Sequence, residues 1–306
     1  MEEQYRDHLS NFHSWDQLEH AEQWILYEDN LGPYLSIDET ALSHGELYTV
    51  ITNKEARGQK GCLVAMIKGT NSQTVREVLN RIPDFKRHKV KEVTLDMAAS
   101  MENIVKYSFP KATLVTDRFH VQKLAFDAVQ EMRIQLRWEA IEQENKEFEL
   151  SKELGKKFIP DIYENGDSLK QLLARSRYLL FKAKSKWTPS QIHRGEILFR
   201  LYPSLETAYN LSIQLGNIFQ TVKDKRVAFT KLAQWYDKVE KAGFKSFMTV
   251  KRSIEAHYPT ILNFFDNRST NASAESFNAK IKAFRSAFRG VRNVTFFLFR
   301  LANIYA

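Results

Sequence analysis

Residues 34–40 read Tyr34-Leu35-Ser36-Ile37-Asp38-Glu39-Thr40, a short and largely apolar run with an acid in its second half. Two further runs, 46–52 and 61–67, follow it and are rich in β-forming or apolar residues. Turn-type residues separate the three runs, as hairpin connections require. We therefore expect three consecutive antiparallel strands, with residues 34–40 as the first and central one.

The next segments alternate between helix and strand. After the capping signal Gly69-Thr70-Asn71-Ser72, residues 74–82 have helical spacing, and residues 90–96 have the composition of a strand. Residues 98–109 predict a helix stopped by Pro110, and residues 112–117 predict a last strand. Strand–helix–strand units give parallel crossovers, so the fold class is α/β, with a mixed five-stranded sheet flanked by helices.

Helical periodicity dominates the rest of the chain. Between about 121 and 264 we find no convincing strand, and Trp138, Trp187 and Trp235 are the expected anchors of a helical core. A last helical region covers 271–306, with an interruption near Gly290. The first thirty residues predict one or two helices that end before Pro33.

Composition narrows the class of protein. The 306 residues carry a formal charge of +8 and a pI near 9.3, which favours a polyanionic partner. Residues 2–30 hold eight acids against one base, so the positive charge lies in the rest of the chain. The single Cys62 excludes an internal disulfide and a multi-cysteine zinc site. Without an apolar run of membrane length or a signal-like N-terminus, we expect a cytoplasmic protein with no membrane partner.

Three acids follow apolar strand residues, namely Asp38, Asp96 and Asp117. Burying such an acid is costly unless it is paired or binds a cation, and parallel strands open their carboxyl ends onto one crevice. Converging carboxylates are ligands that Mg²⁺ accepts together with phosphate oxygens. For any one of the three, a helix cap or turn is the commoner role.

The C-terminal helix adds a fourth acid in an unusual setting. Its positions Asn271, Glu275, Asn278, Lys282, Arg285 and Arg289 are spaced 4, 3, 4, 3, 4 and share one face. An apolar stripe, Phe277, Ile281, Phe284 and Phe288, lies about 100° away on the same helix. Glu275 therefore borders a buried stripe and a basic ridge, where it can enter a cleft. A plain solvated polar face is the alternative.

Four stretches together resemble bacterial insertion-sequence transposases with an RNase H-like DDE catalytic domain, in the group near the mutator-like lineage. They are Ser36-Ile37-Asp38-Glu39, Val93-Thr94-Leu95-Asp96-Met97, Thr116-Asp117-Arg118-Phe119-His120-Val121, and Asn271-Ala272-Ser273-Ala274-Glu275-Ser276-Phe277-Asn278 followed by Lys280 and Lys282. The resemblance implies that Asp38, Asp96 and Glu275 form a triad that binds two Mg²⁺ or Mn²⁺ ions. Asp117 and His120 match the D-x-x-H element of this lineage, and Asp117 is the alternative to Asp96 as second metal ligand.

The resemblance also implies an organisation and a set of partners. The expected segments are an acidic helical N-terminus at 1–32, an RNase H-like core at 33–125, an all-helical insertion at 126–267 and core-completing helices at 268–306. The expected activity is DNA cleavage and strand transfer on transposon ends and target DNA by a homo-oligomer. The residues expected to contact DNA are Asn271, Asn278, Lys280, Lys282, Arg285, Arg289 and Arg292.

One departure from the family and two other functions bear on this expectation. Relatives generally carry an N-terminal zinc-binding element and a helix-turn-helix, neither of which this sequence shows, so end recognition is expected from a separate domain or chain. A nuclease or junction resolvase with the same core would cut DNA without joining it. A non-catalytic DNA-binding derivative would have at least one carboxylate out of reach of the others.

Overall fold

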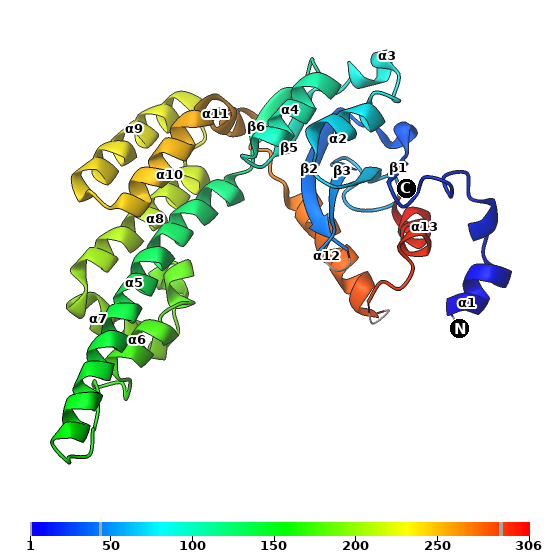
Figure 1. Cartoon of the computed structure of the whole chain (residues 1–306). Helices are drawn as coiled ribbons and strands as arrows, with labels where there is room; N and C mark the ends of the chain where they lie inside the picture. The colour runs from blue at the N-terminus through cyan, green and yellow to red at the C-terminus, as the bar shows by residue number, and fades with distance from the viewer. Residues whose placement is uncertain (1, 43–44, 288–289) are drawn as a thin grey trace. The chain divides into compact units, whose positions relative to one another are not determined.

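The computed structural model describes residues 2–42, 45–287 and 290–306 (Figure 1). These residues form two compact units, each of which is described by itself. Unit 1 comprises Met1–Phe119 and Pro259–Ala306, and unit 2 comprises His120–Tyr258. Unit 1 therefore joins two distant parts of the sequence, while unit 2 is continuous.

Unit 1 is built on a mixed sheet of six strands in the order β1-β4-β3-β2-β5-β6. The strands are β1 (Trp24–Leu26), β2 (Tyr34–Ala41), β3 (Leu47–Asn53), β4 (Leu63–Lys68), β5 (Glu92–Leu95) and β6 (Thr113–Thr116). Strands β1 to β4 pair antiparallel, whereas β2, β5 and β6 pair parallel. All five expected strands are present, and β2 lies between its antiparallel and its parallel neighbour.

The sixth strand, β1, is a correction to the expected five. Trp24, Ile25 and Leu26 pair with Ile67, Met66 and Ala65 of β4, in a segment for which we expected helix. The rest of that segment holds only short helical turns, at Glu2–Leu9, Phe12–Ser14 and Glu28–Asn30. Pairing with β4 buries Ile25 completely, and this long-range contact outweighs the local preference of an acidic segment for helix.

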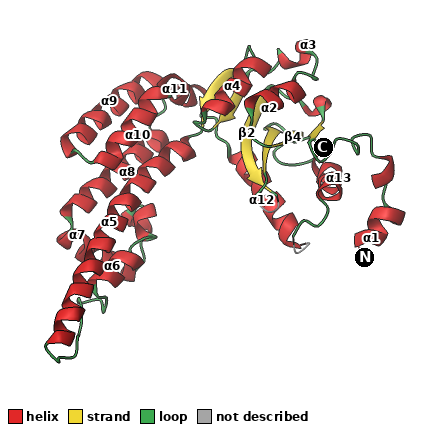
Figure 2. Cartoon of the chain, in the orientation of Figure 1, coloured by secondary structure: helices red, strands yellow, loops and turns green. Residues whose placement is uncertain are grey.

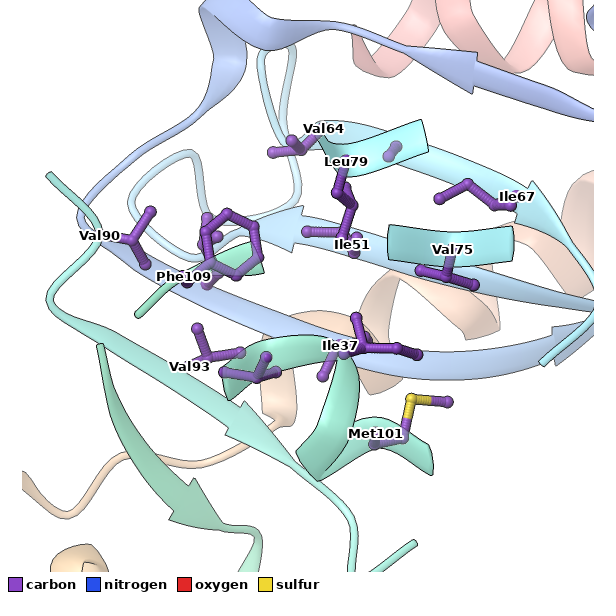
Figure 3. Close-up of a cluster of buried hydrophobic side chains, with 14 of the residues drawn as sticks. Ile37, Ile51, Val64, Ile67, Val75, Leu79, Val90, Val93, Met101 and Phe109 are labelled. Atoms are coloured by element: carbon purple, nitrogen blue, oxygen red, sulfur yellow. The ribbon is translucent and has the colours of Figure 1, made fainter. Parts of the chain in front are cut away.

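Alternation along the strands gives the sheet two different faces. Helices α2 (Ser72–Leu79) and α4 (Ala99–Ser108) cover one face, and the short α3 (Asp84–Arg87) lies between them in sequence. Figure 3 shows Ile37 and Ile51 of the sheet pointing toward Val75 of α2 and Met101 of α4. Each such side chain contributes about 1.5–3 kcal/mol when it is fully buried. Asn71 caps α2 by accepting hydrogen bonds from Gln73 N and Thr74 N.

Helices from the end of the chain cover the opposite face. They are α12 (Ala272–Ala287) and α13 (Val294–Tyr305), seen in orange and red in Figure 1. Phe277 and Ile281 of α12 pack in a buried cluster with Val50 of β3 and Leu298 of α13. Gly290 lies between the two helices with a φ of +113°, which few other residues adopt and which explains the expected break. The preceding α11 (Tyr258–Asn267) leads from unit 2 back to the sheet.

In the residues that the structure describes, the regular secondary structure of unit 2 is helical, with connecting loops and one isolated bridge between Ile162 and Ser168 (Figure 2). Its helices are α5 (Arg118–Glu153), which begins at the end of unit 1, α6 (Leu169–Arg175), α7 (Pro189–Leu201), α8 (Pro203–Thr221), α9 (Lys225–Ala242) and α10 (Lys245–Ala256). No helix in the described part of the chain is long and apolar enough to cross a membrane.

Two of the three expected tryptophan anchors are confirmed. Trp187 and Trp235 are buried, and their indole N–H groups donate to Leu179 O and Leu211 O, both at 2.9 Å. Trp187 packs so closely on Gly195 of α7 that a Cβ there would collide with the ring. The prediction for Trp138 is wrong, because 61% of that residue is exposed on α5.

Candidate active site

Asp38 and Asp96 lie on neighbouring parallel strands and on the same face of the sheet. Ser36 of β2 is in register with Thr94 of β5, and each acid comes two residues later. Since side chains alternate along a strand, both carboxylates leave the face that α12 covers. Burial raises the pKa of the neighbouring Glu39, and the charges of Asp96 and Asp38 raise it further. The carboxylates of Asp38 and Asp96 therefore lie close enough to Glu39 to affect its ionisation.

Asp38 is held through both of its carboxylate oxygens. Its Oδ1 accepts a hydrogen bond from the backbone N–H of Glu39 at 2.8 Å. Its Oδ2 accepts one from Nδ2 of Asn278 on α12 at 2.7 Å. The second contact joins β2 to α12 across 240 positions of sequence, so the orientation of Asp38 depends on where α12 lies.

Asp96 and Asp117 differ in exposure. Asp96 is half-buried. Its Oδ1 accepts a hydrogen bond from Ala98 N at 2.9 Å in the turn before α4, so one of its two oxygens stabilises this turn, as an Asp after a strand commonly does. Asp117 is only 1% exposed, and its Oδ1 accepts from Asn271 N at 3.3 Å. A ligand that must share a metal with a substrate has to be accessible, and burial therefore disfavours Asp117. His120 is half-buried in the first turn of α5.

Glu275 lies in the first turn of α12 and is exposed. It is one turn before Asn278, the residue that contacts Asp38. Residues three apart on a helix have Cβ atoms about 5–6 Å apart, so Glu275 and Asn278 are neighbours on the surface of α12. The side chains have the oxygen ligands that Mg²⁺ and Mn²⁺ prefer. In the described ranges, however, no three His, Cys, Asp or Glu side chains are grouped closely enough to hold a metal ion.

A second buried acid on this face has a different environment. Glu92, at the start of β5, is 2% exposed and accepts from Lys54 Nζ at 3.4 Å and from Asn267 Nδ2 at 3.1 Å. Lys54 also contacts the Thr94 hydroxyl. Burial lowers the pKa of Lys54, while the Glu92 charge and hydrogen bond oppose that shift. The sequence analysis missed this ion pair, because nothing in either strand indicates which basic residue lies beside Glu92.

The amides expected to contact DNA are inside the protein. Asn271 is fully buried, and Asn278 is 9% exposed. The Asn278 side chain donates to Asp38 and, at 3.4 Å, to the backbone carbonyl of Glu39. Asn271 lies just before α12 and Asn278 lies within it, and both are buried, whereas Glu275 and Lys282 of the same predicted face are exposed.

The basic residues of the C-terminal helices divide into two groups. Lys280 Nζ donates to Gly58 O at 2.6 Å, and Arg285 Nη1 donates to Leu42 O at 2.9 Å. These two side chains therefore hold backbone carbonyls of unit 1. Lys282 and Arg292 are exposed. Arg289, together with Phe288 of the expected apolar stripe, lies outside the described residues.

Unit 2 has an exposed basic segment of its own. Arg177, Lys182, Lys184 and Lys186 are exposed between α6 and α7. Next to them, Asp167 is fully buried and forms ion pairs with Arg175 and, at 2.8 Å, with Arg194. Burial alone would raise the pKa of Asp167, but its hydrogen bonds with Arg194 and Arg175 and their charges outweigh that effect and lower the pKa.

Comparisons with known proteins returned a structural match and a family match. Among solved structures, the Drosophila P element transposase strand transfer complex aligns with 90% of this chain and 77% of that chain, at 11% identity and a TM-score of 0.37. No curated protein matches the sequence. The sequence model of the ISL3 transposase family matches residues 35–301, which include β2 to β6, all of unit 2 and α12. The chain therefore belongs to the ISL3 family of transposases.

Proposed function

We propose that this chain is the catalytic protein of an insertion sequence and performs metal-dependent DNA cleavage and strand transfer. In this proposal unit 1 is an RNase H-like core. Three antiparallel strands followed by two parallel ones, β4-β3-β2-β5-β6, support it, with β1 as an added edge strand. Residues 126–267 are then an all-helical insertion, and residues 268–306 complete the core, as expected from the sequence.

The proposed metal ligands are Asp38, Asp96 and Glu275. Two Mg²⁺ or Mn²⁺ ions, when bound, would activate a water or a DNA 3′-hydroxyl and stabilise the leaving oxygen. Asp38 and Asp96 leave the same face of adjacent strands, and Glu275 has to turn inward to join them. Asp117 is the alternative second ligand, and its 1% exposure favours Asp96. Asp117 and His120 remain the residues proposed to form the D-x-x-H element of this transposase lineage.

One observation carries the proposal. The hydrogen bond between Asn278 and Asp38 fixes α12 on β2, so that the first acid and the helix of the third acid are joined at 2.7 Å. In a chain of a transposase family, an acid on the central strand, an acid on its parallel neighbour and an acid on the covering helix favour a catalytic site over a solvated helix face.

The proposed macromolecular partner is double-stranded DNA, both transposon ends and target, bound by a homo-oligomer. Lys282 and Arg292 are the exposed members of the predicted set, and the basic segment between α6 and α7 adds further positive charge. Lysine and arginine contacts to phosphates position DNA without reading its sequence. Recognition of the ends by a separate domain or chain is part of this proposal.

The test is cleavage of end-containing DNA with Mg²⁺ or Mn²⁺, comparing the wild type with Asp38→Asn, Asp96→Asn, Asp117→Asn and Glu275→Gln. We expect Asp38→Asn, Asp96→Asn and Glu275→Gln each to abolish cleavage. Glu142→Gln, an exposed acid on α5, is the matched control and should cleave normally. Strand transfer from pre-cleaved ends separates a transposase from a nuclease that only cuts. Equal cleavage by wild type and Glu275→Gln would refute the catalytic role of Glu275.

A further inference from the structure

The side chain of Asn278 bridges the helix and the strand of the proposed site. Its Nδ2 lies 2.7 Å from Asp38 Oδ2 and 3.4 Å from Glu39 O. Both partners are acceptors, so they require the amide nitrogen, and not the amide oxygen, to face β2. The amide oxygen is buried as well and has no hydrogen-bond partner among the residues that the structure describes. The orientation of this amide is therefore determined by Asp38 and Glu39.

Helix geometry transmits this contact to Glu275. Glu275 and Asn278 are three positions apart, which places them about 4.5 Å apart along the axis of α12. Anchoring Asn278 on Asp38 therefore fixes the distance over which the Glu275 side chain has to reach. Loss of the anchor would leave α12 held by the packing of Phe277 and Ile281, but its first turn, which carries Glu275, could shift relative to β2.

The chemistry of the contact suits a metal ligand better than an ion pair would. On the same sheet, Glu92 receives the ammonium of Lys54, a charge that opposes cation binding. The group that Asn278 presents to Asp38 is a neutral amide, which orients the carboxylate without cancelling its negative charge. Each carboxylate oxygen has two lone pairs, so the hydrogen bonds from Glu39 N and Asn278 Nδ2 do not by themselves prevent coordination of a cation.

We propose that Asn278 is a positioning residue of the active site and not a DNA contact. It orients Asp38 through Oδ2 and sets the register of the helix that carries Glu275. This inference rests on the proposed metal-dependent function. Groups that orient metal ligands typically change metal affinity or activity about 10–100-fold when they are removed. A residue that contacts DNA would instead change DNA affinity and leave metal binding intact.

The experiment uses Asn278→Ala in the full chain, with Ala283→Ser on the same helix as control because Ala283 is exposed on the opposite side. Mn²⁺ binding is measured by calorimetry, DNA binding by fluorescence anisotropy in EDTA, and cleavage as a function of Mn²⁺ concentration. We expect Mn²⁺ affinity to fall about 10–100-fold with DNA affinity within twofold of the wild type. Saturating Mn²⁺ should restore part of the cleavage rate.

Two results would overturn the inference. One is wild-type Mn²⁺ affinity in Asn278→Ala, and the other is weakened DNA binding with normal Mn²⁺ binding. Alanine has a higher helix propensity than asparagine, so α12 should still form. If Asn278→Ala nevertheless fails to fold, Asn278→Leu keeps the approximate volume and removes the donor without adding a charge, and it should lose a similar amount of Mn²⁺ affinity. Absence of Mn²⁺ binding in the wild type is the distinct result that refutes the proposed metal site itself.

Discussion

Glu92→Gln removes the negative charge from a buried ion pair without changing the shape of the side chain. In the wild type, the Lys54 and Glu92 side chains are 15% and 3% exposed, and Asn267 also donates to Glu92. Glutamine can still accept one hydrogen bond through its amide oxygen. The Lys54 ammonium, however, would lose its counter-charge in a site where burial already lowers its pKa.

The magnitude follows from the geometry of the pair. Removing one partner of a buried ion pair costs about 3–5 kcal/mol. Because the N–O distance is 3.4 Å and Lys54 keeps some exposure, we expect the lower end, about 3 kcal/mol. For a unit of about 170 residues, this loss of stability lowers the midpoint temperature of thermal unfolding by about 6–12 °C. The loss should shrink at high pH, because a lysine with a lowered pKa in the folded state destabilises the fold only while it is protonated.

Thermal and urea unfolding of the metal-free protein measure this loss, with the exposed Glu77→Gln as control. The double variant Lys54→Met, Glu92→Gln should recover part of the stability, since it leaves no unpaired charge. At a temperature where Glu92→Gln is folded, its metal-dependent cleavage should persist, in contrast to Asp96→Asn. A Glu92→Gln variant within about 0.5 kcal/mol of the wild type would refute the reasoning.

Four further substitutions have defined outcomes. Asp167→Asn leaves Arg194 without its counter-charge and should destabilise unit 2 by about 3 kcal/mol at neutral pH in denaturant unfolding. Because the Asp167 pKa is lowered by folding, this difference should begin to decline as the pH falls below about 4 and should be lost only as the pH passes through the lower pKa of the folded state, and a constant difference would contradict the assignment. The Glu39 pKa is raised by folding from its ordinary value of 4.5, so Glu39→Gln should raise the melting temperature in EDTA increasingly as the pH rises above that value, whereas a pH-independent effect would count against it. Lys282→Glu and Arg292→Glu should each weaken DNA binding and reduce the slope of log K against log salt concentration by about one, and an unchanged slope would exclude a phosphate contact.

The strands β2 to β6 were predictable because each is a β-forming run bounded by turn residues or by proline. β1 was not, because three residues are too few to show alternation and their acidic surroundings favoured helix. Its partner β4 is about forty positions away in sequence, and local patterns carry no information on such a pairing. The exposed Trp138 has a similar cause, because an aromatic residue at helical spacing does not reveal where a long helix lacks a neighbour.

Only those features of the candidate site that follow from the alternation of side chains along strands and from the spacing of residues on helices could be predicted. These two periodicities place Asp38 and Asp96 on one face of the sheet and Glu275 on a ridge with Asn278. They do not fix the rotation of α12 about its axis, which decides that Asn278 faces Asp38 while Lys282 faces solvent. The contacts of Arg285 with carbonyls at the end of β2 could not be predicted either, because every residue has a backbone carbonyl and the sequence does not show which one a side chain will reach.

The central claim is that Asp38, Asp96 and Glu275 bind catalytic metal ions together. The most direct measurement is anomalous diffraction from crystals of the protein with end-containing DNA and Mn²⁺. We predict Mn²⁺ peaks coordinated by Asp38 and Asp96, with the Glu275 side chain turned inward to complete the site. Peaks coordinated by Asp117 in place of Asp96, or an active DNA complex in which no Mn²⁺ contacts Asp38, would contradict the claim.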